Sequence, residues 1–318
     1  MNATVCPSLI RDDPLCFTPA LLPFYHSLKP NLIEAVPDLI LTLAAPVIAY
    51  WVLSLFFHAL DISEWKWLEK YRIHDSAEVQ AKNLATRSEV VWAVIFQQIV
   101  QTALGILTLS QEETHVTDHS RELRSWATAI EPLLSRALGD RMSPLLLARV
   151  TEFLYWWGVP ALQFLTAMFI IDTWQYFLHR LMHVNKFLYK RFHSWHHRLY
   201  VPYAFGSLYN HPVEGFLLDS VGALLAESLT GMTTRQAMLL FTFSTLKTVD
   251  DHCGYNLPWD PLQMITGNNA DYHDIHHQSG GIKSNFAQPF FVHWDTLLGT
   301  RMTREELEKR RQKSRKTE

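Results

Sequence analysis

The chain is poor in charge and in cysteine. Only 19 % of its 318 residues are charged and 48 % are hydrophobic, whereas soluble domains carry about 25 % charged residues. This shortage of charge favours a membrane protein. The three cysteines, Cys6, Cys16 and Cys253, form neither a disulfide framework nor a C-x-x-C zinc motif. Sulfur is therefore not expected to be the main ligand of any metal.

No strong excess of either charge is present. The net charge of −3 gives no reason to expect a nucleic-acid partner. The one obvious basic run lies in the tail, residues 301–318, which we expect to be a solvated cytosolic helix or a disordered end. Residues 1–30 lack the basic start and continuous apolar run of a signal peptide.

Three long apolar runs are present, at residues 39–57, 90–110 and 153–171. Each is close to the length of about 20 residues that crosses a bilayer. Three buried helices of a large soluble protein are the alternative. Helical spacing of apolar residues continues from the third run to His183, so a helix over 153–183 would be about 46 Å long. Its polar end must leave the membrane and carry His179 and His183 with it.

Two shorter apolar runs follow, at residues 215–226 and 236–246. They are too short for confident spans, and they predict a re-entrant or hairpin pair that returns the chain to the same side. The predicted fold is an all-α, polytopic membrane protein with three to four transmembrane helices, this helical pair and a cytosolic histidine-rich cap.

The loops indicate an orientation and a domain plan. Residues 58–89 carry five basic side chains, which agrees with a cytosolic location. The N-terminus is then lumenal, where Asn2 could accept a glycan and Cys6 could pair with Cys16. We expect four segments: a lumenal part, the first two membrane helices with their loops, a histidine-rich domain and the basic tail, at 1–35, 36–150, 151–300 and 301–318.

Histidines dominate the second half of the chain. Nine of them lie in "HRLMH", "HSWHH", "DDHCGYN" and "DYHDIHH", and in a helix the first and last members of each triplet share a face. Their number exceeds the four ligands of one tetrahedral site, so the pattern predicts two metal ions and favours catalysis over a structural zinc site. The candidate ligands are His179, His183, His193, His196, His197, His252, His273, His276 and His277.

Other polar residues lie beside these clusters. Asp271 and Asp274 flank His273, so they either cap a helix or accept a proton from a ligand's ring nitrogen. His211 in "NHPVEG" could cap a helix or bind metal. The histidines outside the clusters, among them His74 and His293, are expected to be structural.

The three histidine motifs resemble the histidine-box signature of the fatty acid hydroxylase and sterol desaturase superfamily, over roughly residues 60–300. The stretches "RFHSWHHRLYVPYAFGSLYNHPVEGFLLD" and "NNADYHDIHHQSGGIKSNFAQPFFVHWDTLLGT" look like the fungal sphinganine C4-hydroxylases. The resemblance implies an endoplasmic reticulum enzyme that 4-hydroxylates dihydrosphingosine or dihydroceramide. It also implies two irons, O₂, and electrons passed from NAD(P)H by a separate cytochrome b5 and its reductase.

The resemblance also implies how the ligands are shared. One metal would take His179, His193, His196, His273 and His276, and the other His183, His197, His252 and His277. Some family members have a further histidine where this chain has Asn256, which leaves room for water or a weak amide ligand.

Alternatives stay open at this point. A sterol C4-methyl oxidase or lipid desaturase would share the metal site, and a membrane scaffold would bind metal without turnover. The sequence does not distinguish free base from ceramide, or iron from zinc in purified protein.

Overall fold

The computed structural model describes residues 23–26, 29–63, 65–109 and 118–316. Within these ranges the chain is helical, with isolated β-bridges and no strands. The all-α prediction is therefore confirmed for this part of the chain. The expected glycan at Asn2 and the Cys6–Cys16 pair lie outside the described residues, as does most of the 1–35 segment.

Three helical runs are long and apolar enough to cross a membrane. They are α1 (Asp38–Ile62), α4 (Arg87–Leu109) and the 41-residue run Pro144–Val184, which joins α6 (Pro144–Phe153), a π-helical turn at Leu154–Gly158 and α7 (Val159–Val184). The third run begins earlier than predicted, because Ser143 caps its first turn and Pro144 suits that position. At about 61 Å it exceeds the bilayer core, so part of it projects from the membrane.

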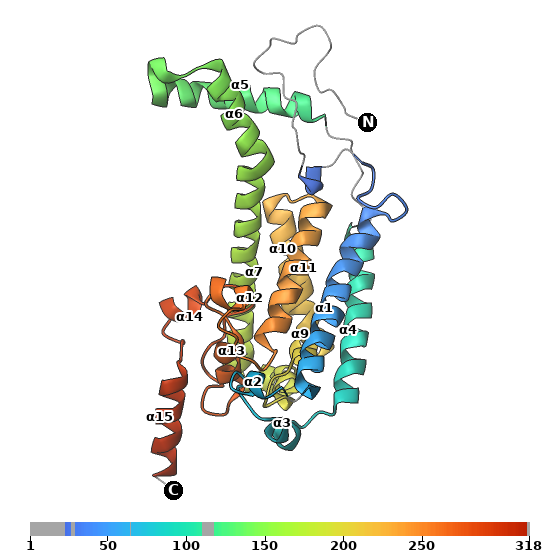
Figure 1. Ribbon diagram of the computed structural model, residues 1–318, viewed down its shortest axis with the longest axis vertical. Coiled ribbons are helices and arrows are strands. Elements are labelled where there is room, and N and C mark those ends of the chain that lie inside the picture. Colours follow the sequence, from blue (N-terminus) through green and yellow to red (C-terminus); the bar gives the residue numbers. More distant parts are fainter. Residues whose placement is uncertain (1–22, 27–28, 64, 110–117, 317–318) are drawn as a thin grey trace.

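The predicted hairpin is confirmed, and both arms are longer than expected. The first arm joins α9 (Pro212–Gly215), a π-helical turn (Phe216–Ser220) and α10 (Val221–Thr230), and the second is α11 (Thr234–Asp251). Gly231 ends α10 in the left-handed region at φ 61°, and a capping box starts α11. The hairpin lies between the long helices, with α10 against α7 and α11 against α1 (Figure 1).

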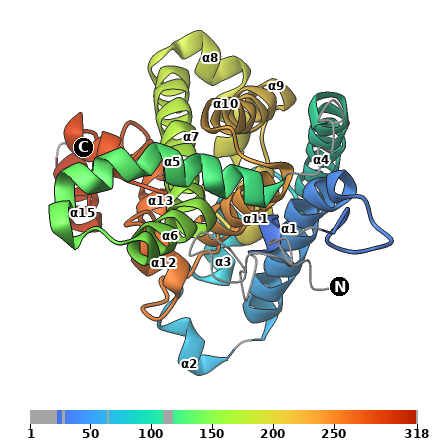
Figure 2. The ribbon, with the colours of Figure 1, turned by 90° about the horizontal axis from the view of Figure 1, so that it is seen from above.

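The remaining helices lie at the two ends of this bundle. Figures 1 and 2 show α5 crossing the end opposite to α13, while the short helices of the histidine-rich region lie near the other end. Their bounds are α2 Lys66–Glu69, α3 Ser76–Lys82, α5 His119–Leu138, α8 Lys186–Arg191, α12 Pro261–Ile265, α13 Ala270–His277 and α14 His293–Leu297.

The basic tail is a helix, α15 (Arg304–Arg315), as one of the two predictions for it stated. It is not wholly solvated, however. Leu307 is fully buried in a small cluster with Ile275 and Met302, and the Arg304 guanidinium bonds two carboxylates of α13. The tail helix therefore packs on the helix that carries the last histidine triplet.

Candidate metal centre

The nine clustered histidines meet at one end of the bundle, from four segments of the chain. Two lie on the last turns of α7, three on the 3-10 helix His193–Arg198, one at the C-cap of α11 and three on α13. Eight of the side chains are buried and His197 is partly buried. The segments are up to a hundred residues apart in sequence, so only the folded bundle brings these rings together.

The rings form two groups, and within each group the candidate ligand atoms lie within 4.8 Å of one another. The first group has five imidazoles: His179, His183, His193, His197 and His276. The second group has four: His196, His252, His273 and His277.

This division differs from the one implied by the family resemblance, which placed the first two histidines of each triplet together. In the structure the first and third members share a group. The Nε2 atoms of His193 and His197 are 3.0 Å apart, as are those of His273 and His277. On α13 the physical reason is that residues i and i+4 lie on one face of an α-helix, whereas the ring of His276 points toward the other group.

Hydrogen bonds to the backbone fix the tautomers of these rings. The Nδ1 atoms of five histidines lie 2.7–3.2 Å from carbonyl oxygens. A carbonyl oxygen can only accept, so each Nδ1 must donate a proton, and the neutral ring then carries its lone pair on Nε2. The five are His179, His196, His252, His276 and His277.

Those lone pairs point at one another. In the second group the Nε2 atoms of His196 and His277 are 3.1 Å apart, although both rings carry their proton on Nδ1. Two lone pairs at that distance, with no proton between them, repel unless a cation lies between them. The donor set therefore fits a metal ion in each group. Imidazole nitrogen suits iron, zinc and copper.

Burial keeps these rings neutral. It lowers the pKa of His193 to about 3 and the pKa of His196 to about 4. It also holds the pKa of His273 and of His277 well below the ordinary value, with neighbouring imidazoles adding to the effect. At neutral pH all four rings are uncharged, which is the state that binds a metal.

The sequence analysis missed one carboxylate. Glu214, on α9, is buried, and its Oε1 lies 2.5 Å from Nδ1 of His193. Burial raises the pKa of Glu214 to about 7. A carboxylate on the outer nitrogen of a ligand ring fixes its tautomer and increases its basicity. Glu214 is the acidic residue of "NHPVEG", the stretch that also contains His211.

The carboxylates predicted to support His273 have other partners. Asp271 bonds Arg304, and Asp274 bonds Arg304, His74 and Gln278. Both side chains lie on the face of α13 that meets α15 and His74, whereas the histidines lie on the opposite face. His74, expected to be structural, bridges Asp274 to Glu78 of α3 with two contacts of 2.8 Å.

The two other auxiliary residues are placed outside the histidine groups. The Nδ1 atom of His211 accepts the Val213 N–H and so caps α9, as one of its two predictions stated. Asn256 is exposed, and its backbone N–H donates to Tyr71. This position does not support the predicted role of Asn256 as a weak ligand.

Fold and site together define a polytopic membrane protein with a paired polyhistidine centre. The fatty acid hydroxylase family matches residues 164–300, a range that contains all nine histidines. The chain belongs to the fatty acid hydroxylase family of membrane oxidoreductases.

Named relatives extend this match over most of the chain. The sphingolipid C4-hydroxylase SUR2 of Saccharomyces cerevisiae is 50 % identical over 86 % of this chain and 74 % of its own length. Sphinganine C4-monooxygenase 1 of Arabidopsis thaliana is 46 % identical over 84 % of this chain and 89 % of its own length. A rice protein named very-long-chain aldehyde decarbonylase GL1-9 is 43 % identical over 81 % of this chain and 86 % of its own length. No solved structure matches the chain.

Proposed function

We propose that this protein hydroxylates carbon 4 of sphinganine or of the same base within dihydroceramide. The observation that carries the proposal is the convergence of unprotonated Nε2 atoms into two adjacent groups at the end of a membrane bundle. The names of the yeast and Arabidopsis relatives supply the substrate class.

The proposed metal centre holds two iron ions, one in each histidine group. Iron bound there would supply the activation of O₂ that an unactivated C–H bond requires, with one oxygen atom entering the product and the other leaving as water. Two electrons and two protons complete this balance. We propose that the electrons come from NAD(P)H through a reductase and cytochrome b5.

The nine histidines would hold the metals, and backbone hydrogen bonds keep five of them in the ligating tautomer. Placement at the end of the bundle suits a substrate whose reactive carbon is close to its polar head. We propose that this end faces the cytosol and that the membrane is the endoplasmic reticulum. The five basic residues of the 58–89 loop agree with that orientation, although residues 111–150 also carry five arginines.

Labelled sphinganine fed to a host that lacks 4-hydroxylated bases tests the function. Expression of the wild-type chain should yield labelled phytosphingosine, read by mass spectrometry of the long-chain bases. His276→Ala should abolish the product while the protein remains in the membrane, because the ring contributes to the five-histidine group.

Other outcomes distinguish the alternatives. A 4,5-unsaturated base would indicate a desaturase, and turnover of a methylsterol would indicate a C4-methyl oxidase. Conversion of a long-chain aldehyde would match the name of the rice relative instead. Absence of any product from well-expressed protein would contradict the proposal and favour a non-catalytic metal scaffold.

A further inference from the structure

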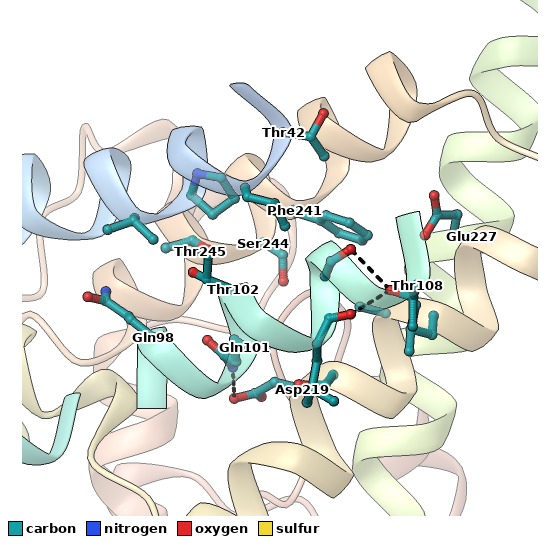
Figure 3. A pocket seen from close by; sticks show the side chains of 18 of the residues that line it. Thr42, Gln98, Gln101, Thr102, Thr108, Asp219, Glu227, Phe241, Ser244 and Thr245 are labelled. Carbon is teal, nitrogen blue, oxygen red and sulfur yellow. Dashed lines mark hydrogen bonds between the residues drawn. The ribbon is translucent and has the colours of Figure 1, made fainter. Parts of the chain in front are cut away.

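A cavity of about 180 Å³ lies inside the bundle, between α1, α4, α10 and α11 (Figure 3). It adjoins the histidine groups at one end. Thr248 lines the cavity and its carbonyl accepts the Nδ1 proton of His252, while Gln175 lines it one helical turn before His179. The cavity therefore lies next to residues that hold or precede the histidines, although none of the nine histidines lines it.

The lining changes character along the cavity. The half nearer the histidines carries Gln98, Gln101, Asp219, Thr245 and Thr248, whereas the far half is mostly apolar. The far half includes Leu43, Leu104, Leu109, Leu224 and Phe241, with Glu227 also at that end. Such a gradient fits an amphiphile with its polar groups close to the histidines.

Asp219 is the one carboxylate in the polar half of this lining. Its Oδ2 accepts hydrogen bonds from Nε2 of Gln97 at 3.0 Å and of Gln101 at 3.4 Å, and the second of these is visible in Figure 3. Gly215 permits the first, because a Cβ there would lie only 2.4 Å from the Gln97 side chain. The carboxylate is thus held in place by neutral amides.

No protein cation balances this carboxylate from within the cavity. Among the described residues that line it there is no lysine, arginine or histidine. An ionisable side chain at membrane depth is costly and normally faces a functional partner. A positive charge on the ligand would provide that partner.

We propose that Asp219 binds the protonated amino group of a free long-chain base, with the alkyl chain in the apolar half of the cavity. This inference rests on the proposed function and adds to it a preference for free base over ceramide. An N-acylated base carries a neutral amide at that position, so it cannot form the ion pair.

The distances allow this arrangement. Asp219 follows Glu214 by five residues of continuous helix, which separates them by about 7.5 Å along the axis, and Glu214 contacts His193 directly. Three bonds separate the amino nitrogen from carbon 4 of the base, so these atoms lie within about 4 Å of each other. The arrangement requires carbon 4 to lie on the histidine side of Asp219, with the alkyl chain turned back into the apolar half of the cavity.

Asp219→Asn tests the proposal, and Glu227→Gln is its matched control, because it neutralises the other carboxylate of the same cavity. KM and kcat are measured for sphinganine and for dihydroceramide with each protein in membranes. Loss of a hydrogen-bonded ion pair should raise KM for sphinganine about tenfold or more in Asp219→Asn, with kcat little changed. KM for dihydroceramide should change far less, and Glu227→Gln should leave the ratio of the two substrates unaltered.

Direct binding gives a second readout that needs no turnover. Purified protein should bind radiolabelled sphinganine more tightly than its N-acetyl derivative, and Asp219→Asn should remove that difference. An equal loss for both ligands, or no loss for either, would overturn the inference. If the wild-type protein binds sphinganine selectively but yields no phytosphingosine, the proposed function fails while the assignment of Asp219 stands.

Discussion

At the scale of single residues, Glu214 and the backbone carbonyls orient the histidine rings. Glu214 lies 2.5 Å from the outer nitrogen of His193, and both side chains are almost fully buried. The other outer contacts described in the structure are to neutral carbonyl oxygens. Among the described outer contacts, only the five-histidine group therefore has a carboxyl partner, which increases the basicity of the His193 ring when it is ionised.

Replacing Glu214 should weaken metal binding in that group. Loss of such a supporting carboxylate typically costs about 10–100-fold in metal affinity or activity, so Glu214→Leu should retain less metal after dialysis against a chelator. Glu214→Gln keeps an oxygen that can accept a hydrogen bond from His193. It should therefore retain an amount of metal between that of the wild type and that of Glu214→Leu. Metal per chain, measured by mass spectrometry, checks this, and full retention by the leucine variant would contradict it.

His74 predicts a pH dependence. Burial alone would lower the pKa of His74, but its contacts with Asp274 and Glu78 raise that pKa above its ordinary value. A histidine whose pKa is raised by folding adds stability below its unfolded pKa, and this contribution is lost as pH rises through the folded value. The melting-temperature difference between wild type and His74→Gln should therefore shrink as the pH rises above the ordinary histidine pKa of about 6.5. A difference that grows with pH would argue against this ion pair.

At the scale of elements, α15 acts as a brace for α13. Leu307 is fully buried against Ile275 and Met302, and Arg304 ties the same helix to Asp271 and Asp274. These contacts hold α13 on the face opposite to its histidines. The tail helix therefore helps to set the positions of His273, His276 and His277.

Shortening the Leu307 side chain should weaken the packing of α15 on α13. Leu307→Ala is expected to cost about 2–5 kcal/mol of packing free energy, which should increase hydrogen exchange in α15 and α13 and lower metal retention. Leu297→Ala, at a site that is 71 % exposed on α14, serves as the control and should change neither. Unaltered exchange in α13 would mean that α15 does not stabilise it.

Most of the long helices and the clustered histidines could be predicted from the sequence, because runs of apolar residues and histidines at i and i+4 are local patterns. The three spans, the hairpin and the nine clustered histidines followed from them. The carbonyl partners of the histidines could not be predicted in this way, because the Phe286 carbonyl that bonds His179 is 107 residues away in sequence. The allocation of rings between the two groups, and the docking of α15, likewise depend on tertiary contacts that no short window of sequence contains.

At the scale of the whole molecule, α13, which carries the last histidine triplet, and α5 lie toward opposite ends of the bundle (Figure 1). If the histidine end is cytosolic, the two ends differ in access to reagents. In a background without the native cysteines, Gln312→Cys on α15 should react with a membrane-impermeant maleimide in sealed microsomes. Ser135→Cys on α5 should react only after detergent is added. The reverse pattern would invert the proposed orientation.

His276 and His277 are neighbours in sequence but belong to different groups, and His196 and His197 are divided in the same way. Each triplet thus contributes to both groups, and any tilt of α13 displaces ligands of both at once. A metal bound in one group would therefore also order the helical turns that carry ligands of the other. Loading of the centre should accordingly be cooperative, so that partly metallated protein is scarce and the first ion bound prepares the place of the second.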